Sequence, residues 1–175
     1  MDLTRNSDDR LSLSPFRPSD AAALYAADRD PEHRRRFDFP PNFTPSLRHA
    51  AAVIAQWEQE GLAGTRLPFA IRDATNGAVL GGCELRPLEH GGAALAYWTL
   101  PAHRRQGVAT RAVRLACGLA TRLGFKQLEA EVDLDNAASR RVVERNGFES
   151  AGMKGGREVL RRALPAEAAQ PELAG

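Results

Sequence analysis

The spacing of apolar residues changes abruptly at Pro68. Before this residue, the apolar positions of residues 47–57 follow the 3.6-residue period of a helix, whereas the segments PFAIR, VLGGCELR and ALAYWTL beyond it are typical of strands. Residues 107–123 return to the helical period, and residues 127–134 alternate strictly between polar and apolar side chains, as in a strand with one buried face. Hairpins followed by alternating helices and strands predict an α+β (mixed α/β) fold in which helices flank a mixed sheet.

Proline, asparagine and glycine residues indicate where these elements begin and end. Asp30-Pro31 and Thr44-Pro45 predict helix starts, and Gly61 predicts the end of the helix that Thr44-Pro45 opens. Asn76-Gly77 predicts a type I′ hairpin turn, because both residue types tolerate positive φ angles. Gly155-Gly156 predicts a closing hairpin. The expected N-caps of two further helices are Ser19 or Asp20 and Asn136.

The length of 175 residues fits one domain with its own hydrophobic core. We expect this domain at residues 10–164, between tails at residues 1–9 and 165–175, because both ends are polar or rich in alanine and proline. No apolar run approaches the ~18–20 residues of a membrane span, and the first residues lack the apolar centre of a signal peptide. These features predict a cytoplasmic protein with no membrane partner.

The cysteines and histidines carry no metal-binding signature. Cys83 and Cys117 form no metal-spaced pair, and the four histidines show neither an H-x-x-x-H pattern nor a Cys/His cluster. We therefore expect no metal, and we expect both cysteines to be buried, reduced thiols. A reaction relayed through cysteine is disfavoured, since neither thiol has an evident base beside it.

The net charge of +2 conceals a local separation of charge, because no acidic residue occurs between Glu89 and Glu129. A loop with a glycine at position 107 leads here from a strand into a helix, whose N-terminal amides attract anions. The pattern predicts either a polyphosphate ligand or a solvated, arginine-rich helix face, and the loop lacks the glycine spacing of ATP and NAD sites. The cations of this stretch are Arg104, Arg105, Arg111, Arg114, Arg122 and Lys126.

The motif R-x-x-G-x-A-T at residues 104–110 resembles the acyl-CoA pyrophosphate loop of the GNAT superfamily of N-acetyltransferases. The segments AYWTLPAHRRQGVAT and LEAEVDLDN, and the run from N-A-A-S-R-R to N-G-F at residues 136–148, are similar to its RimJ/RimL-type branch, which acetylates protein N-termini. LSLSPFRPSDAAAL and FAIRDATNGAVLGGCELRP are also similar to that branch. The likeness thus runs in order from about residue 10 to about residue 164.

The resemblance implies the GNAT acyl-CoA N-acyltransferase fold, whose mostly antiparallel sheet has splayed fourth and fifth strands, here at residues 94–100 and 127–134. Acetyl-CoA is the implied cosubstrate, with its pantetheine arm in the gap and its pyrophosphate on the amides of residues 105–110. Asn136 matches the family residue that bonds the pantetheine arm, and an ordinary helix N-cap is the alternative. The implied cofactor-binding residues are Trp98, Thr99, Leu100, Arg104, Arg105, Gln106, Gly107, Val108, Ala109, Thr110, Asn136 and Ser139.

The resemblance further implies direct attack of a neutral amine on the thioester, with a carboxylate or a chain of waters taking the proton of the amine. Ser139 matches the residue that would protonate the leaving thiolate, and a helix serine bonded to backbone is the alternative. Ala94 stands where many relatives have a glutamate and Val143 where many have a tyrosine acid, so homology assigns neither base nor acid. The substitute bases are Glu84, Glu131 and Asp133, for which ordinary surface carboxylates are the alternative.

The leading function is acetylation of a protein or peptide N-terminal α-amine, and a ribosomal protein is one such partner. A small amine, namely a polyamine, an amino acid or an aminoglycoside, is the alternative acceptor, because the acidic side chains of residues 129–135 would attract any cation. A catalytically silent acyl-CoA-binding module is the alternative from a different class, since both Ala94 and Val143 depart from the family pattern.

The turn at Gly155-Gly156 predicts an acceptor cleft that is open on that side, because relatives often carry a longer loop there. No nucleic-acid partner is expected, because acidic residues flank the basic run of residues 33–36 and the overall charge is near zero. Homodimers are common in the RimJ/RimL-type branch, so a homodimer is a further expectation.

Overall fold

The computed structural model describes residues 5–166, and most of the predicted C-terminal tail lies outside this range. The strands are β1 (Asn6–Ser7), β2 (Leu11–Pro15), β3 (Leu67–Asp73), β4 (Val79–Pro87), β5 (Gly92–Thr99), β6 (Gln127–Asp133), β7 (Glu149–Lys154) and β8 (Arg157–Ala163). The helices are α1 (Ala21–Arg29), α2 (Pro31–Arg36), α3 (Leu47–Ala63), α4 (Val108–Arg122) and α5 (Ala137–Glu144). None of the helices within residues 5–166 combines the length and the apolar character that crossing a membrane requires.

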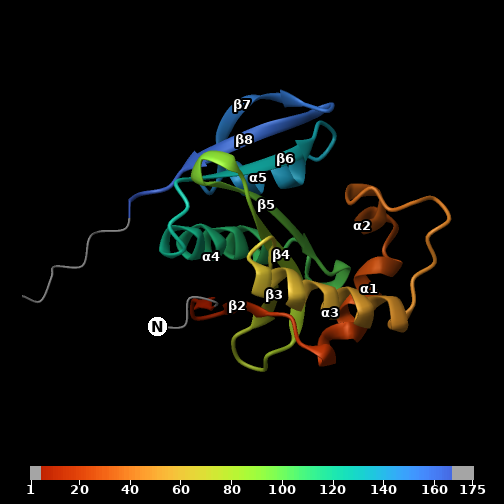
Figure 1. Cartoon of the computed structure of the whole chain (residues 1–175). Coiled ribbons are helices and arrows are strands. Elements are labelled where there is room, and N and C mark those ends of the chain that lie inside the picture. Colours follow the sequence, from red (N-terminus) through yellow and green to blue (C-terminus); the bar gives the residue numbers. More distant parts are fainter. Residues whose placement is uncertain (1–4, 167–175) are drawn as a thin grey trace, which may run out of the picture.

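All eight strands form one sheet in the order β1-β2-β3-β4-β5-β6-β8-β7. Neighbouring strands are antiparallel except β5 and β6, which run parallel. α4 packs against β2, β4 and β5 on one face of the sheet, while α1 and α3 lie on the other face (Figure 1). The mixed, mostly antiparallel sheet flanked by helices confirms the predicted fold class.

Two apolar clusters hold the helices on the sheet. The larger cluster lies under α4 and includes Leu13, Leu85, Leu119 and Leu128, which are almost completely buried. The smaller cluster joins α1 to α3 on the opposite face, and its buried members are Leu24, Ala50 and Ile54. The alternation of β6 explains the first cluster, because its apolar residues all point to one side of the strand.

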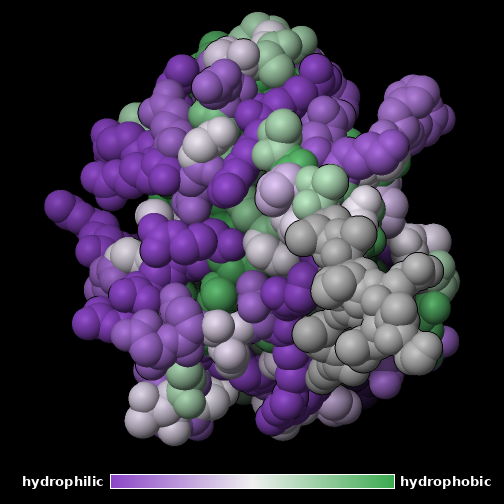
Figure 2. Space-filling view, turned by 90° about the vertical axis from the view of Figure 1, so that its left-hand side faces the viewer, coloured by the Kyte–Doolittle hydropathy of each residue, from purple (hydrophilic) through white to green (hydrophobic). Residues whose placement is uncertain are grey.

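α4 is amphipathic in the predicted way. Its residues Val108, Ala112, Leu115 and Leu119 are buried, and the helix ends before Gly124, whose φ of +81° is the left-handed conformation that glycine favours after a helix. The side of the molecule at the C-terminal end of α4 is mostly hydrophilic, with only small hydrophobic areas (Figure 2). The helix therefore presents its apolar stripe to the sheet and its polar residues to water.

Two local predictions about turns and helix ends were wrong. The turn between β3 and β4 is not type I′, because Gly77 has a positive φ but Asn76 does not, and the Asp73 carboxylate instead accepts hydrogen bonds from the Thr75 and Asn76 amides at 2.8 and 3.2 Å. α3 continues past Gly61 to Ala63, because a glycine inside a helix costs only about 1 kcal/mol.

The start of α3 and the N-terminal segment also differ from expectation. Ser46, rather than Thr44, is the N-cap of α3, and its hydroxyl accepts a hydrogen bond from the His49 amide at 3.0 Å. The predicted tail at residues 1–9 is shorter, because Asn6–Ser7 pair with β2 and the Asn6 amide donates to the Leu115 carbonyl at 2.7 Å. A two-residue strand without apolar alternation carries no signal in the sequence.

A buried ion pair joins β2, β3 and the start of α1. The Arg72 guanidinium donates to both carboxylate oxygens of Asp20, at 2.6 and 3.0 Å, and its Nε donates to the Ser14 hydroxyl at 2.8 Å. Burial acts to raise the pKa of Asp20, but hydrogen bonds from Arg72 and from the Arg17 amide hold that pKa below its ordinary value. Asp20 is the N-cap residue of α1, one of the two positions expected, but its carboxylate caps no amide of that helix and is the counter-ion of a buried arginine.

Replacing Asp20 by asparagine is expected to destabilise the fold by about 3–5 kcal/mol, because Arg72 would stay buried without a counter-ion. Urea unfolding measures this loss. Asp9→Asn is the control, since Asp9 pairs with Arg111 at the surface and should cost less than about 1 kcal/mol. In the unchanged protein the Asp20 contribution should be complete above the ordinary aspartate pKa of 3.8 and be lost as the pH falls below it. Equal stability of both variants would contradict this role.

Candidate active site

The candidate site begins where β5 and β6 separate. The two parallel strands pair only at Gly92 with Gln127, Ala93 with Leu128 and Ala94 with Glu129. Beyond Ala94 and Glu129 they diverge, so the inner edge of each strand has no strand partner. β5 remains paired with β4 and β6 with β8, which keeps both edges rigid. The predicted splay of these two strands is therefore present.

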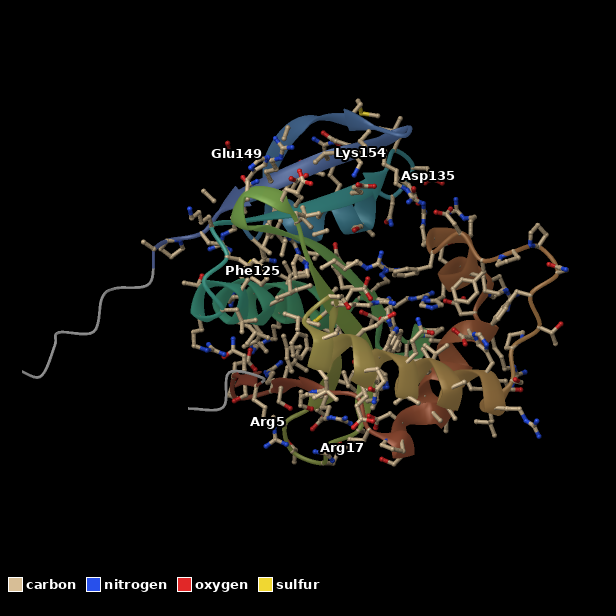
Figure 3. The ribbon with its side chains drawn as sticks, viewed as in Figure 1. Arg5, Arg17, Phe125, Asp135, Glu149 and Lys154 are labelled. Atoms are coloured by element: carbon tan, nitrogen blue, oxygen red, sulfur yellow. The ribbon has the colours of Figure 1, made fainter. Side chains whose placement is uncertain are left out.

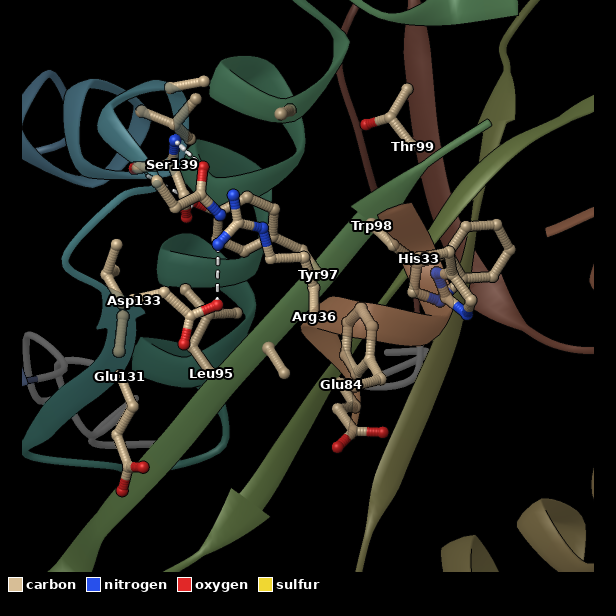
Figure 4. Close-up of a pocket in the computed structure, with 18 of the residues that line it drawn as sticks. His33, Arg36, Glu84, Leu95, Tyr97, Trp98, Thr99, Glu131, Asp133 and Ser139 are labelled. Atoms are coloured by element: carbon tan, nitrogen blue, oxygen red, sulfur yellow. Dashed lines mark hydrogen bonds and ion pairs between the residues drawn. The ribbon is translucent and has the colours of Figure 1, made fainter. Parts of the chain in front are cut away.

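A cleft of about 750 Å³ occupies the gap between the strands. Its walls come from β5, β6, the loop before α4, the start of α5 and the segment of α2 (Figure 4). Every predicted catalytic residue lines this cleft, as do most of the predicted cofactor-binding residues. The lining residues from that prediction are Glu84, Trp98, Thr99, Arg104, Arg105, Gly107, Val108, Ala109, Thr110, Glu131, Asp133, Asn136 and Ser139.

The loop before α4 has the backbone of an anion site. Arg105 and Gly107 both adopt positive φ angles, +61° and +79°, so the chain turns sharply into the helix. Gly107 is the N-cap residue and has no side chain to cap α4, which leaves the first amides of the helix open towards the cleft. Gln106 does not line the cleft, and its side chain donates to the Ala102 carbonyl at 2.9 Å within the loop.

The acid-free stretch between Glu89 and Glu129 places fewer cations around the cleft than the sequence predicted for a phosphate site. Of its six cations, all inside the described range, Arg104 and Arg105 line the cleft and the other four do not. Arg104 forms an ion pair with Asp30 at the N-cap of α2, and Arg111 pairs with Asp8 and Asp9 near the N-terminus. Much of the predicted positive charge therefore ties loops and helices together.

Two cations that sequence reasoning missed come from α5 and its C-cap. Arg141, in α5, and Arg145, the C-cap residue, line the same cleft as Arg105, and none of these three arginines forms an ion pair or side-chain hydrogen bond with any residue from 5 to 166. Their spacing of four residues places Arg141 and Arg145 on the same side of the helix end, which is a signal that the sequence does contain. The cleft thus has three arginines free to meet a charged ligand.

A pair of hydroxyl groups spans the cleft next to α5. The Tyr97 hydroxyl lies 2.6 Å from the Ser139 Oγ and also donates to the Ser139 carbonyl at 3.2 Å (Figure 4). Burial raises the pKa of Tyr97 to about 12, and the hydrogen bond with Ser139 opposes this shift only in part. Tyr97 is a third residue that sequence reasoning missed, and its hydroxyl stays protonated throughout the neutral range.

Asn136 holds Ser139 in place from the other side. Its side-chain oxygen accepts a hydrogen bond from the Ser139 amide at 3.0 Å, as expected of a helix N-cap. The structure thus confirms the predicted cap, and the side-chain nitrogen of Asn136, Nδ2, has no hydrogen-bond partner within residues 5–166. That nitrogen faces a cleft and can still donate to a ligand.

The three candidate bases all carry ion pairs. Glu84 is bonded by Arg66, through Nε at 2.7 Å, and by Arg86, through Nε at 2.7 Å to the second oxygen. Glu131 accepts from Lys154 at 2.7 Å. An acidic face that attracts cations was therefore a wrong prediction, because the acidic residues of β6 are neutralised by the protein's own cations.

Asp133 and Asp135 bind α2 across the mouth of the cleft. Arg36 donates to Asp133 at 2.9 Å and also pairs with Asp135, and Arg35 donates to Asp135 at 2.9 Å (Figures 3 and 4). We call these four residues the α2 ion-pair network. Burial acts to raise the pKa of Asp133, but hydrogen bonds from Arg36 and Arg157 lower it. The side of the cleft near Gly155-Gly156, which was predicted to be open, is thus crossed by α2. The contacts of α2 take the place of the longer hairpin loop that relatives often carry there.

The remaining sequence expectations concern buried positions. Val143 is fully buried in the core under α4, so it cannot approach a substrate. Cys83 and Cys117 are both buried free thiols, as predicted, and burial raises the pKa of both, which disfavours the nucleophilic thiolate. Within the described residues no group of three histidine, cysteine, aspartate or glutamate side chains could hold a metal ion.

Known structures share this architecture. RimL, a ribosomal alpha-N-protein acetyltransferase solved with coenzyme A, superimposes with a TM-score of 0.77 and 18% identity over 91% of this chain and 97% of its own. Mycobacterium smegmatis RimJ, in complex with CoA-disulfide, gives 0.71 and 23% over 87% and 81%. A spermidine N-acetyltransferase chimera of Vibrio cholerae SpeG and hSSAT gives 0.67 and 17% over 88% and 94%. These likenesses support the fold.

Sequence comparison supplies the family. No curated protein matches the chain. The family model described as the acetyltransferase (GNAT) domain matches residues 10–149, which is well over half of the chain and contains the loop, the separated strands and Ser139. The chain therefore belongs to the GNAT family of acetyltransferases, and the reaction that its cleft serves depends on acetyl-CoA.

Proposed function

We propose that this protein transfers the acetyl group of acetyl-CoA to the α-amine at the N-terminus of a protein or peptide. The observation that carries the proposal is the pair of facing, unpaired edges of β5 and β6 in one cleft. One edge would hold the pantetheine arm, and the other offers backbone groups with which an extended peptide can pair. The names of the structural neighbours RimL and RimJ agree with a protein acceptor.

The cofactor would bind along β5 and the start of α4. The backbone at Trp98 and Thr99 would pair with the pantetheine arm, whereas the predicted Leu100 lies outside the cleft lining and its amide donates to the Leu80 carbonyl at 2.9 Å. The side-chain amide of Asn136 would bond to the same arm, and the backbone amides at the start of α4 would hold the pyrophosphate. The free arginines, Arg105 together with Arg141 and Arg145, would neutralise the phosphates. Arg104 would act indirectly, because its ion pair with Asp30 fixes the loop against α2.

The acyl transfer would proceed by direct attack. The neutral nitrogen of the acceptor forms a bond to the thioester carbonyl carbon, and collapse of the oxyanion breaks the carbon–sulfur bond. The sulfur leaves as a thiolate and takes a proton from Ser139, which Tyr97 replenishes through their hydrogen bond. Glu84 would accept the proton of the amine through water, since it lines the cleft on the same face as Trp98. Glu131 and Asp133 would keep structural roles.

A small amine is the second candidate acceptor, because the α2 ion-pair network narrows the mouth of the cleft. A panel of N-terminal peptides and small amines, followed by release of free thiol from acetyl-CoA, distinguishes the two. We expect kcat/KM for the best peptide to exceed that for spermidine, an amino acid amide or an aminoglycoside by more than about tenfold. Preference for a small amine would overturn the peptide assignment. Stabilisation by acetyl-CoA without thiol release from any amine would indicate a silent binding module.

Reversing one charge in the cleft should weaken acetyl-CoA binding. Arg105→Glu is expected to raise the Kd of acetyl-CoA by about tenfold, equivalent to ~1.4 kcal/mol, as measured by calorimetry. Arg114→Glu, on α4 but outside the cleft, is the matched control. Gly107→Leu should raise the Kd as well, whereas Gly124→Leu should not, although both glycines have φ near +80° and open space around a new Cβ. Unchanged binding in the Gly107 variant would remove the loop assignment.

The hydroxyl pair and Glu84 should affect the chemical step. Ser139→Ala is expected to lower kcat by about 10²-fold with little change in KM for acetyl-CoA, and Tyr97→Phe by less, because Ser139 then loses only its proton source. Glu84→Gln should lower the rate at neutral pH and recover at high pH, where the acceptor amine loses its proton unaided. A rate deficit of Glu84→Gln that is independent of pH would exclude Glu84 as the base.

A further inference from the structure

A second pocket, of about 290 Å³, adjoins the cleft on the face of the sheet that carries α1 and α3. His33, Phe37 and Trp98 line both cavities and form the wall between them. We call the second cavity the aromatic pocket, because rings make up most of its apolar lining. The rings besides the two histidines are Phe16, Phe37, Phe39, Trp57 and Trp98.

The rings are fixed by contacts with one another and with the sheet. The centroid of Phe16 lies 4.9 Å from that of Trp57, and the His33 ring meets Trp98 edge-on at 5.3 Å. Gly82 makes room for the indole of Trp98, because a Cβ there would lie 2.7 Å from the ring. Rigid walls of this kind bind a ligand without having to be ordered first.

Asp28 lies in the wall of this pocket and has no partner. It is 2% exposed, and its carboxylate receives no hydrogen bond from any residue between 5 and 166. The nearest cation candidate is His33, whose Nε2 is 3.8 Å away, too far for a hydrogen bond. Arg34 donates to the backbone carbonyl of Asp28 at 2.8 Å and leaves the carboxylate free.

A protonated histidine does not account for the burial of the Asp28 carboxylate, and its position in the fold does not account for it either. Burial lowers the pKa of His33 to about 4, so this imidazole is neutral near pH 7, while burial raises the pKa of Asp28 to about 6. Asp28 also lies in the last turn of α1, where the helix dipole disfavours a negative charge. A buried acid without a hydrogen bond in such a place reduces stability, and the more distant charges of His49 and Arg34 offset this cost only in part, because the pKa of Asp28 stays raised.

The other charges around the aromatic pocket balance one another. Arg66 and Arg86 both pair with Glu84, and Arg66 lies 3.5 Å from Glu60 as well. His49 also lines the pocket, and its charge acts on the Asp28 carboxylate from a distance, but no hydrogen bond or ion pair joins the two. Of the two acids that line this pocket, Glu84 is thus hydrogen-bonded to a cation, whereas Asp28 has no hydrogen-bonded cation among residues 5–166.

We propose that the aromatic pocket binds a second, positively charged group of the acceptor, with Asp28 as its counter-ion and the aromatic rings as its walls. This inference rests on the proposed transfer of acetyl to an amine in the adjoining cleft. Aromatic faces and a carboxylate together recognise an ammonium or guanidinium group. A neutral group would leave Asp28 unpaired, and an anionic group would be repelled by it. The acceptor class is therefore a dication, either a peptide with a basic side chain near its N-terminus or a diamine.

Matched acceptors test the charge preference. The peptides Ala-Lys-Ala-Ala and Ala-Met-Ala-Ala differ mainly in one charge, as do 1,4-diaminobutane and butylamine, so the two pairs also distinguish peptide from polyamine sources. For the better pair, we expect the wild-type protein to show a kcat/KM about tenfold higher with the charged acceptor than with the uncharged one. The difference should arise from a lower KM for the charged acceptor. Asp28→Asn should bring this ratio close to one. Glu58→Gln, an exposed acid on α3 outside both cavities, should keep it. An unchanged ratio in Asp28→Asn would overturn the proposal.

A binding measurement keeps the inference testable if no acceptor is acetylated. Trp57 and Trp98 are the two tryptophans of the chain, and both line the aromatic pocket, so their fluorescence reports its occupancy. Ala-Lys-Ala-Ala or 1,4-diaminobutane should change the emission saturably, with a Kd about tenfold higher for Asp28→Asn. The variant is expected to fold, because it removes an unpaired buried charge. Binding without acetylation would refute the proposed function alone, and equal titrations of wild type and Asp28→Asn would refute the pocket.

Discussion

The separation of β5 from β6 is the constraint on which the rest of the site depends. Two parallel strands that part after Ala94 and Glu129 leave backbone groups that no neighbouring strand satisfies. Such edges are costly in a closed core and useful where a ligand supplies the missing partners. The antiparallel neighbours β4 and β8 hold the two edges open, so the cleft is part of the fold and does not have to be made by a ligand.

Arginine is used here mainly as internal structure. Arg72 is buried against Asp20, Arg104 joins the loop before α4 to α2, and Arg36 reaches from α2 to β6. Each of these pairs connects elements that are far apart in the sequence, and the pairs of Arg104 and Arg36 join different walls of the cleft. The near-neutral total charge therefore reflects local pairing, and the few unpaired charges around the cleft and the aromatic pocket become informative for that reason.

Prediction from sequence succeeded where the signal is local. The apolar stripe of α4, the alternation of β6 and the glycine before α4 depend on residues a few positions apart, and each was present as expected. Prediction from sequence failed where a carboxylate is bound by a side chain that is distant in the sequence. An acidic face that attracts cations and an open side near Gly155 were wrong, because arginines elsewhere in the chain bind these carboxylates or cross the gap. Asp20 lies at the predicted N-cap position of α1, but its side chain pairs with Arg72, which the sequence did not predict.

The sequence by itself determined the order of most elements, the glycine turn before α4 and the family to which the chain belongs, because periodicity and glycine positions act through local backbone geometry. Only the tertiary structure decided which side chains share a cavity. Tyr97 meets Ser139 and Asp28 meets a ring of aromatic residues only after the sheet and helices pack. The physical reason is that burial and pairing determine the charge and hydrogen bonding of a group, and both depend on neighbours that folding brings from distant parts of the chain.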